Sequence, residues 1–192
     1  DLIEGFYAGA LDHPTFQEAI GQVARRFDAR FGTHGKKTND MLRILEHDSV
    51  GFDAVWFARW TEVMTQPDNE SMPFLGEVGN VWSHCPGVEF VFNANQELPD
   101  YTGFHFENWS RPQGIGPSLG AVTEVDERTN SVLMVARSPD QPGFTREEDR
   151  AMARLGRHVA RAIELRNRVR ALEERLTLAQ SMLDRFDLPA IV

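Results

Sequence analysis

The chain has 192 residues, a formal net charge of −9 and 41% apolar residues, among them 13 Phe and 4 Trp. This length and apolar content suffice for one domain with an extension, or for two small lobes, and they exclude a disordered chain. The acidic balance argues against a broad nucleic-acid-binding surface, and no apolar run reaches the ~18 residues of a membrane helix. The one cysteine, Cys85, cannot form an intrachain disulfide and favours a cytoplasmic location.

The first part of the chain is predicted to be helical. Apolar residues recur at three- and four-residue spacing through residues 2–31, with the aromatic ones facing inward. Asp12-His13-Pro14 interrupts this run, which predicts either two helices, with Asp12 as the cap of the second, or one broken helix. The polar stretch GTHGKKTND at 32–40 predicts a loop.

Several β-prone runs follow. Residues 41–48 alternate well enough for a strand, with a short helix as the alternative, and residues 88–94 predict a short strand. Between them, GFDAVWFARWTEVM at 51–64 has the apolar spacing of a helix. Further on, runs at 118–125 and 131–138 flank five polar residues, DERTN, which predicts a hairpin. The fold class expected from these elements is α+β, with an antiparallel sheet flanked by helices.

The longest predicted helix covers residues 144–186. Thr145 and Glu148 form a capping-box pattern, with Phe144 at the position of the hydrophobic staple. A helix of ~40 residues is about 60 Å long, which is longer than one domain of this size can cover. We therefore expect the far half of the helix to find another partner.

The second half of this helix carries a heptad pattern, with alternating steps of three and four residues between apolar positions and with flanks rich in Arg and Glu. A long amphipathic helix that packs only within its own domain is the alternative. A parallel coiled-coil homodimer is favoured, because the pattern continues well past the end of the predicted sheet. The predicted dimerisation residues are Leu165, Val169, Leu172, Leu176, Ala179, Leu183 and Phe186.

No enzyme motif is present in the sequence, so we expect no catalytic residues and no enzymatic activity. The glycine-rich GIGPSLG at 114–120 does not fit a dinucleotide fingerprint, because a strand and not a helix follows it. His84-Cys85-Pro86 is best interpreted as a turn with a half-buried cysteine, with haem ligation as the alternative. The other histidines lack metal-ligand spacing, so neither a metal nor a cofactor is expected.

Aromatic residues gather in the middle of the chain. Such density usually means a core, but aromatic side chains also line apolar cavities that hold a small molecule. Trp56, Trp60 and Met64 are spaced by four residues on one face of the predicted helix and are the first candidates for ligand contact. Arg111 follows closely after Trp109 and could pair with an acidic group on a ligand; a salt bridge or loop anchor is its alternative role. The predicted ligand-binding residues are Trp56, Trp60, Met64, Phe74, Trp82, Phe90, Phe104, Trp109 and Arg111.

Several motifs, taken in order, resemble the N-terminal GAF- or PAS-like sensor region of bacterial LuxR-type helix-turn-helix transcriptional regulators. They are LIEGFYAGALDHPTFQEAI, GFDAVWFARWTEVMTQPD, ENWSRPQGIGPSLGAV, FTREEDRAMARLGRHVARAIELRNRVRALE and SMLDRFDLPAIV. In the second motif, Gly51 and Asp53 match the family pattern, whereas Trp60 and Met64 stand where the family has tyrosines. Because of these departures, the resemblance does not imply that this chain binds a ligand that the tyrosines would hold.

The resemblance implies a GAF/PAS-like sensor domain that binds a small effector and acts on DNA only through a C-terminal domain outside these residues. We expect the sensor domain at 1–143, a signalling and dimerisation helix at 144–187, and the start of a truncated further segment at 188–192. The expected partners are a second copy of the chain and a small, mostly apolar effector, with no membrane. A protein-interaction or dimerisation module without a ligand remains the alternative function.

Overall fold

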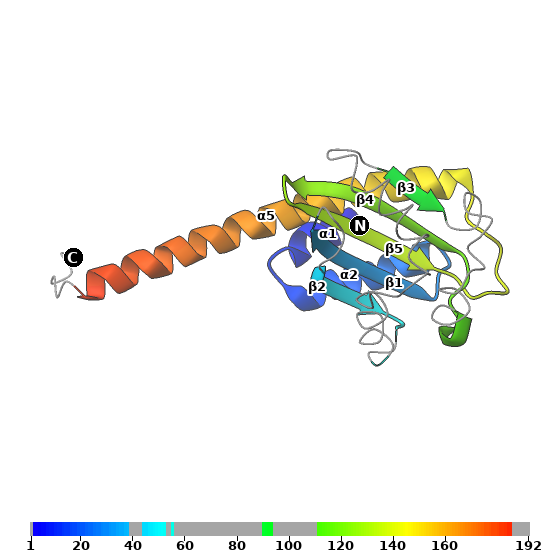
Figure 1. Ribbon diagram of the computed structural model, residues 1–192, viewed down its shortest axis with the longest axis horizontal. Coiled ribbons are helices and arrows are strands. Elements are labelled where there is room, and N and C mark those ends of the chain that lie inside the picture. Colours follow the sequence, from blue (N-terminus) through cyan, green and yellow to red (C-terminus); the bar gives the residue numbers. More distant parts are fainter. Residues whose placement is uncertain (1, 39–43, 53–54, 56–89, 94–110, 186–192) are drawn as a thin grey trace, which may run out of the picture.

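The computed structural model describes residues 2–38, 44–52, 55, 90–93 and 111–185. These residues form an α+β fold (Figure 1), which confirms the predicted fold class. In chain order the elements are α1 (Leu2–Gly9), α2 (His13–Arg26), β1 (Phe31–Thr38), β2 (Ile44–Val50), β3 (Phe90–Asn93), η2 (Arg111–Gln113), β4 (Ser118–Asp126), β5 (Thr129–Ala136) and α5 (Arg146–Arg185).

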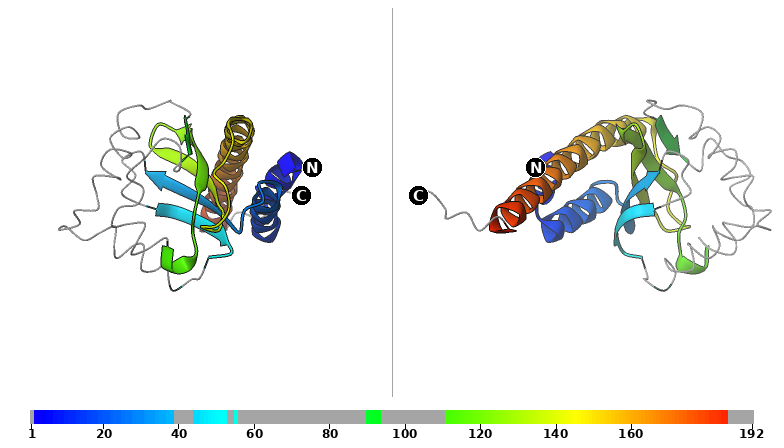
Figure 2. Two further views of the ribbon diagram at one scale, coloured as in Figure 1. Left: turned by 90° about the vertical axis from the view of Figure 1, so that its right-hand side faces the viewer. Right: turned by 60° about the vertical axis from the view of Figure 1, so that its left-hand side comes forward.

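The strands form one five-stranded sheet in the order β2-β1-β5-β4-β3, and all neighbouring strands are antiparallel. Helices α1, α2 and α5 all lie on the same side of the sheet (Figure 2). Successive side chains of a strand point to opposite sides, so each strand divides its residues between two faces. We call the side covered by these helices the helix face and the opposite side the outer face.

The two predicted N-terminal helices are confirmed, with the break where the sequence placed it. The Asp12 carboxylate accepts a hydrogen bond from the amide of Thr15 at 3.0 Å and another from its hydroxyl. These bonds, the one from the hydroxyl first, hold the pKa of Asp12 below its usual value. The second helix ends at Arg26 and not at residue 31, because Asp28 takes a positive φ of 49° that turns the chain into β1.

The loop predicted at 32–40 is wrong. Residues 31–38 form β1, which pairs with β2 on one side and with β5 on the other. Gly32 suits the close packing of α2, because a Cβ atom there would lie only 3.1 Å from both the backbone oxygen and the Cγ2 atom of Ile20. The small and polar residues that resemble a loop in the sequence thus allow a helix to approach an inner strand closely.

The predicted strands at 41–48 and 88–94 are confirmed as β2 and β3, and the predicted hairpin as β4 and β5. Its connection is shorter than the five residues expected, because Asp126 already pairs with Thr129. The Asp126 carboxylate accepts a hydrogen bond from the amide of Arg128 at 2.9 Å, which fixes the tight turn. The helix predicted at 51–64 falls almost entirely outside the described residues.

The glycine-rich stretch at 114–120 leads the chain into β4, as predicted. Gly114 has a φ of +71°, a conformation that favours glycine. A Cβ atom at Gly116 would lie 2.6 Å from the Cα atom of Pro139, and its amide donates to the carbonyl of Arg137 at 2.7 Å. Both glycines therefore serve the bend and the close contact of two chain segments.

The helix face of the sheet carries the main core. Strand residues such as Leu119, Leu133 and Val135 pack against side chains from all three helices, and none of them is more than 1% exposed. The first half of α5 contributes a buried apolar stripe to this core. Its members are Met152, Leu155, Val159 and Ile163. Among the described residues, the space between sheet and helices is therefore filled.

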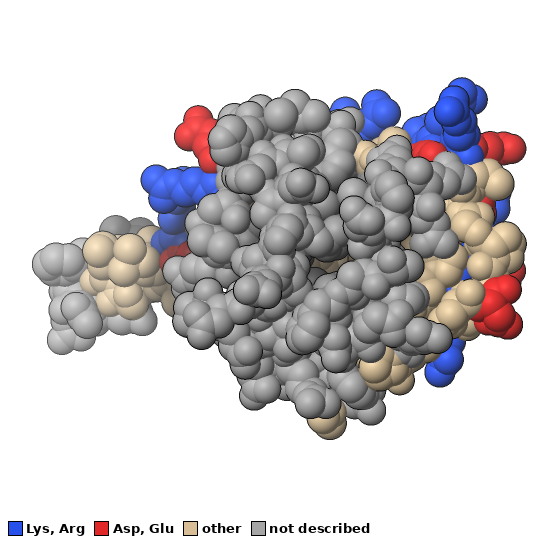
Figure 3. Space-filling model, turned by 45° about the vertical axis from the view of Figure 1, so that its right-hand side comes forward, with Lys and Arg blue, Asp and Glu red and all other residues tan. Residues whose placement is uncertain are grey.

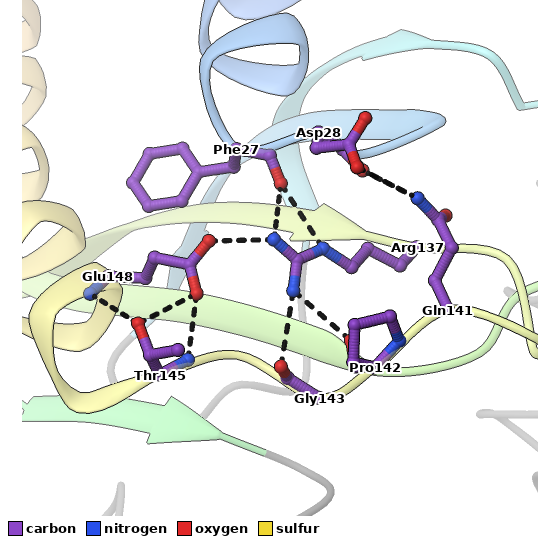
Figure 4. Close-up of polar contacts among 8 residues, drawn as sticks. All are labelled: Phe27, Asp28, Arg137, Gln141, Pro142, Gly143, Thr145 and Glu148. Carbon is purple, nitrogen blue, oxygen red and sulfur yellow. Dashed lines mark hydrogen bonds and ion pairs between the residues drawn. The ribbon is translucent and has the colours of Figure 1, made fainter.

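The N-terminus of α5 is tied to the rest of the fold through Arg137, at the end of β5 (Figure 4). The predicted capping box forms, since the Glu148 carboxylate accepts a hydrogen bond from the Thr145 amide at 2.7 Å while the Glu148 amide donates to the Thr145 hydroxyl. Burial raises the pKa of Glu148, but the hydrogen bonds from Thr145 and the charge of Arg137 outweigh it, so the pKa lies below its usual value. Phe144, the predicted staple residue, is fully buried.

Candidate functional site

The outer face of the sheet is the candidate site for a small molecule. Its apolar part includes Phe31, Ile115 and Ala136, which form a small cluster of their own with Phe52. The rings of Phe31 and Phe52 lie 5.0 Å apart between centroids. This cluster is separate from the main core on the helix face, so the sheet has apolar side chains on both sides.

A polar pair interrupts the apolar residues of the outer face. The Thr33 hydroxyl lies 2.8 Å from Nε2 of His47 and donates a hydrogen bond to the carbonyl of Asp48 at 3.0 Å. A hydroxyl has one proton to donate, so the proton between Thr33 and His47 belongs to Nε2. The pair ties β1 to β2 and places hydrogen-bonding atoms among the apolar side chains of the outer face.

Two strands present glycine on the same face. Met134 of β5 stands directly opposite Gly120 of β4 on one side and opposite Thr33 of β1 on the other. The next outer-face position of β1 is Gly35. Because glycine has no side chain, the backbone of the sheet is uncovered by side chains next to the half-buried Met134. An extended apolar group can approach the sheet closely at such a position.

Of the ligand-binding residues predicted from the sequence, two lie on described backbone. The pairing of Phe90 with Val122 gives it an outer-face position in β3, and Arg111 begins η2. The side chains of both residues lie outside the description. The remaining candidates also lie outside the described residues, as does Cys85 of the haem alternative, so these predictions stay predictions. The remaining candidates are Trp56, Trp60, Met64, Phe74, Trp82, Phe104 and Trp109.

Sequence reasoning missed Thr33 and His47 as candidate site residues. Thr33 was missed because the segment at 32–40 was predicted to be a loop, where period-two alternation is not sought. His47 lies in the predicted strand at 41–48, but the sequence does not reveal which strand pairs with it. The available signal was the strict alternation of Thr33 and Gly35 with His34 and Lys36, which separates the two faces of a strand.

A partly buried polar cluster occupies the helix face where α5 leaves the sheet. Glu46 of β2 pairs with Arg166 of α5, and its other oxygen lies 3.5 Å from Arg170. Lys36 of β1 donates a hydrogen bond to Asn167 at 3.4 Å. The guanidinium of Arg166, a residue that is only 5% exposed, thus has its charge compensated by the edge strand. These contacts hold α5 in a defined position just before it extends away from the sheet.

His34 lies in the same cluster and is fully buried. Its Nε2 atom is 3.1 Å from the Ser131 hydroxyl, and its Nδ1 has no hydrogen-bond partner among the described residues. Burial, followed by the nearby charge of Arg166, lowers the pKa of His34 from 6.5 to about 3. The imidazole is therefore neutral in the folded chain at neutral pH.

We expect His34 to make the protein less stable as the pH falls. The unfolded chain takes up a proton near pH 6.5, whereas the folded chain does so only near pH 3, so the free energy of unfolding falls by about 1.4 kcal/mol per pH unit between these values. Urea unfolding at pH 6.5 and pH 5 measures this slope above the usual range of the carboxyl groups. In His34→Gln the slope should be shallower by this amount. An unchanged slope in that variant would show that His34 is not the group responsible.

The second half of α5 extends beyond the sheet (Figure 1), and the predicted dimerisation residues begin where Arg166 and Asn167 still contact β2 and β1. Leu165, Leu172, Leu176 and Leu183 are 43%, 63%, 60% and 59% exposed, Val169 is half-buried and Ala179 is exposed. Phe186 lies outside the described residues. An open hollow of about 460 Å³ on this helix, from Arg170 to Ser181, has lining residues from α5 only and is therefore an exposed helix surface.

Metal-ligating side chains are dispersed in the described part of the chain, where no three His, Cys, Asp or Glu residues are grouped so that they could hold a metal ion. None of the described helices is long and apolar enough to cross a membrane. In the view of Figure 3, basic and acidic side chains lie near one another at both the left and the right margins of the molecule.

Solved structures resemble this chain although no protein-family model and no curated protein sequence matches it. The LBD domain of VqsR from Pseudomonas aeruginosa has a TM-score of 0.58 at 13% identity, covering 86% of this chain and 94% of that one. CepR2 from Burkholderia cenocepacia, described as an N-acylhomoserine lactone dependent LuxR-family transcription factor, has a TM-score of 0.53 at 14% identity, covering 86% and 95%. A GAF domain/HD domain protein from Geobacter sulfurreducens has a TM-score of 0.49 at 16% identity, covering 84% and 97%. The chain therefore has the fold of the LuxR-type ligand-binding domains, as the motifs in its sequence predicted.

Proposed function

We propose that this chain is a dimeric sensor module that binds a small, mostly apolar effector on the outer face of its sheet. The effector changes how α5 is held, and α5 carries that change toward whatever follows it in the chain. The observation that supports the proposal most directly is that the two faces of the sheet carry different sets of side chains. The helix face is filled with packed side chains and holds α5, while the outer face offers apolar residues, glycines and one polar pair.

The chemistry of the outer face favours an apolar ligand with one polar group. Phe31, Val122 and Val132 supply buried apolar side chains, and the half-buried Met134 adds one that adapts to different shapes. The Thr33 hydroxyl oxygen, whose own proton goes to the Asp48 carbonyl, can accept a hydrogen bond from an amide or hydroxyl group of the ligand. The lactone dependence of CepR2 makes N-acylhomoserine lactones the first ligands to test, because they combine an acyl tail with amide and ester groups.

Strand β2 provides a physical link between the proposed ligand and α5. His47 stands on the outer face beside Thr33, whereas its neighbour Glu46 stands on the helix face and pairs with Arg166 and Arg170. A ligand that displaces His47 therefore moves the strand that holds α5. Coupling requires the ligand to favour one arrangement of this contact over the other.

A homodimer is supported by the leucines of α5. A single helix that extends into solvent gains little stability from its own hydrogen bonds, and burial of an exposed leucine contributes about 1.5–3 kcal/mol. A second copy of α5 would cover these leucines without help from another protein. The proposal includes no catalytic step.

The experiment is a thermal-shift and calorimetric titration of the chain with N-acylhomoserine lactones of graded acyl length, alongside fatty acids and small aromatic acids. We expect at least one lactone or acid to raise the melting temperature and to bind with one site per chain. In Met134→Trp the larger ring should occupy the space over Gly120 and reduce binding at least tenfold, because it competes with the ligand for the same surface. Glu18→Trp, at an exposed position of α2, is the control and should bind as the wild type does.

If no compound in the panel binds, or if Met134→Trp binds every ligand as the wild type does, the outer face is not the site. In the first case a dimer that is present without any ligand would favour the alternative, a dimerisation module without an effector.

A further inference from the structure

We infer that two copies of α5 form a parallel, in-register coiled coil that begins at Leu165. The inference rests on the proposed homodimer and specifies the partner surface, the direction and the starting point. It follows from three features of α5: the apolar positions of the heptad, the signs of the charges that flank them, and the residues that the chain itself already covers.

The heptad positions follow from the spacing. Leu165, Leu172 and Ala179 take the d positions, with a step of four to Val169, Leu176 and Leu183 at the a positions. All six lie on one side of the helix for five turns. A Val at an a position with Leu at d is compatible with the packing of a two-stranded parallel coil.

The charges beside the apolar positions favour the parallel direction. The g positions carry Arg168 and Arg175, and the following e positions carry Glu173 and Gln180. In a parallel coil a g residue meets the e residue five positions further on in the other chain. Arg168 then faces the partner's Glu173, and the symmetric contact repeats this pair.

The antiparallel direction places like charges together. There a g position faces a g position of the other chain, so that Arg168 approaches the partner's Arg175. Two such contacts would arise by symmetry. The attractive pair of Arg168 with the partner's Glu173 therefore forms only in the parallel arrangement. The repulsive pair of Arg168 with the partner's Arg175 forms only in the antiparallel one.

The same heptad positions are covered within the chain before Leu165. Ala162 is fully buried, and His158 lies 3.4 Å from the Tyr7 hydroxyl of α1. Arg166 is turned toward Glu46 of β2. Helix α1 thus covers this side of α5 before Leu165, which is the first heptad residue that is substantially exposed, and β2 still contacts Arg166 and Arg170 beyond it.

Arg168 is free to exchange partners on dimerisation. It now pairs with Glu164 one turn earlier, at 2.5 Å, and the side chains of the two residues are 73% and 45% exposed. Such an exposed pair contributes little to stability, so its loss does not oppose the contact with the partner's Glu173.

Two cysteine variants of the full chain test the direction and register. In Ala179→Cys the new thiols face each other across a d position, whereas in Ser181→Cys they lie at an f position on the far side of the helix. Under mild oxidation we expect Ala179→Cys to form a disulfide-linked dimer at least ten times faster than Ser181→Cys. The native Cys85 is present in both variants, and the wild-type chain shows its contribution.

A charge exchange tests the specific pair. Glu173→Arg should weaken dimerisation about tenfold, since two exposed attractive contacts become repulsive, and adding Arg168→Glu should restore it. In an antiparallel coil, Arg168→Glu alone would strengthen the dimer instead.

Sedimentation equilibrium separates the two levels of the proposal. A wild-type chain that is monomeric at tens of micromolar overturns the dimer itself and this inference with it. A stable dimer in which Ala179→Cys does not cross-link faster than Ser181→Cys, or in which the charge exchange does not restore association, overturns only the direction and register.

Discussion

Arg137→Ala is expected to lower the free energy of unfolding by about 3–5 kcal/mol, the cost typical of removing one partner from a buried ionic network. Nε and Nη2 of Arg137 donate to the Phe27 carbonyl at 3.2 and 2.9 Å, and Nη1 donates to the carbonyls of Pro142 and Gly143 at 3.1 and 3.2 Å. Nη2 also lies 2.7 Å from the Glu148 carboxylate. One side chain therefore joins the end of α2, the loop after β5 and the start of α5 (Figure 4).

The loss has an identifiable physical origin. Arg137 is 7% exposed, so its removal leaves carbonyl groups without their donors, and Glu148 keeps only the hydrogen bonds from Thr145. The guanidinium also lies 4.1 Å from the centre of the Phe144 ring, a contact that is lost as well.

Urea unfolding followed by circular dichroism measures this effect. Arg137→Lys is the matched control, because it keeps the charge near Glu148 but has a single nitrogen to serve several acceptors. We expect its loss to be intermediate. If Arg137→Ala costs less than about 1 kcal/mol, the range of an exposed pair, the role assigned to this arginine is wrong.

Leu176→Asp is expected to raise the dissociation constant of the dimer at least 100-fold. Leu176 lies at the middle of the exposed heptad positions and is 60% exposed in the single chain. The substitution removes two leucines from the dimer interface, each of which contributes about 1.5–3 kcal/mol when buried, and it places two negative charges there. The fold of the single chain should be unaffected, because this part of α5 extends beyond the sheet (Figure 1).

Leu178→Asp provides a closely matched comparison. Leu178 is 56% exposed in the same turn of α5, but it lies outside the a and d positions. Sedimentation equilibrium should show a dimer for Leu178→Asp and a monomer for Leu176→Asp at the same concentration. Equal weakening by both substitutions would contradict a heptad interface and would indicate association through another surface of the helix.

The sequence predicts those elements of this fold whose local signals agree with their tertiary environment. The hairpin of β4 and β5 has two long apolar runs on either side of a turn, and α5 begins with a capping box formed by Thr145 and Glu148. In each case the residues that define the element contact one another within the same short segment. Such signals do not depend on what lies elsewhere in the chain.

The prediction failed at β1 because its environment is supplied by distant segments. Gly32 packs under α2, His34 bonds to Ser131 of β5, and Lys36 contacts Asn167 of α5. None of these partners is close in sequence, so a polar and glycine-containing segment looks like a loop. The outer-face pair Thr33–His47 was missed for the same reason, because it joins two strands whose pairing the sequence does not reveal.

Native mass spectrometry of the purified chain, before and after incubation with the ligand panel, tests the central claim most directly, since one spectrum reports both the number of chains and any bound small molecule. The proposed function predicts a species with the mass of two chains that carries a small molecule, and the same species without that added mass for Met134→Trp. A bare single chain that no member of the panel changes would contradict the proposal that this fold acts here as a dimeric sensor.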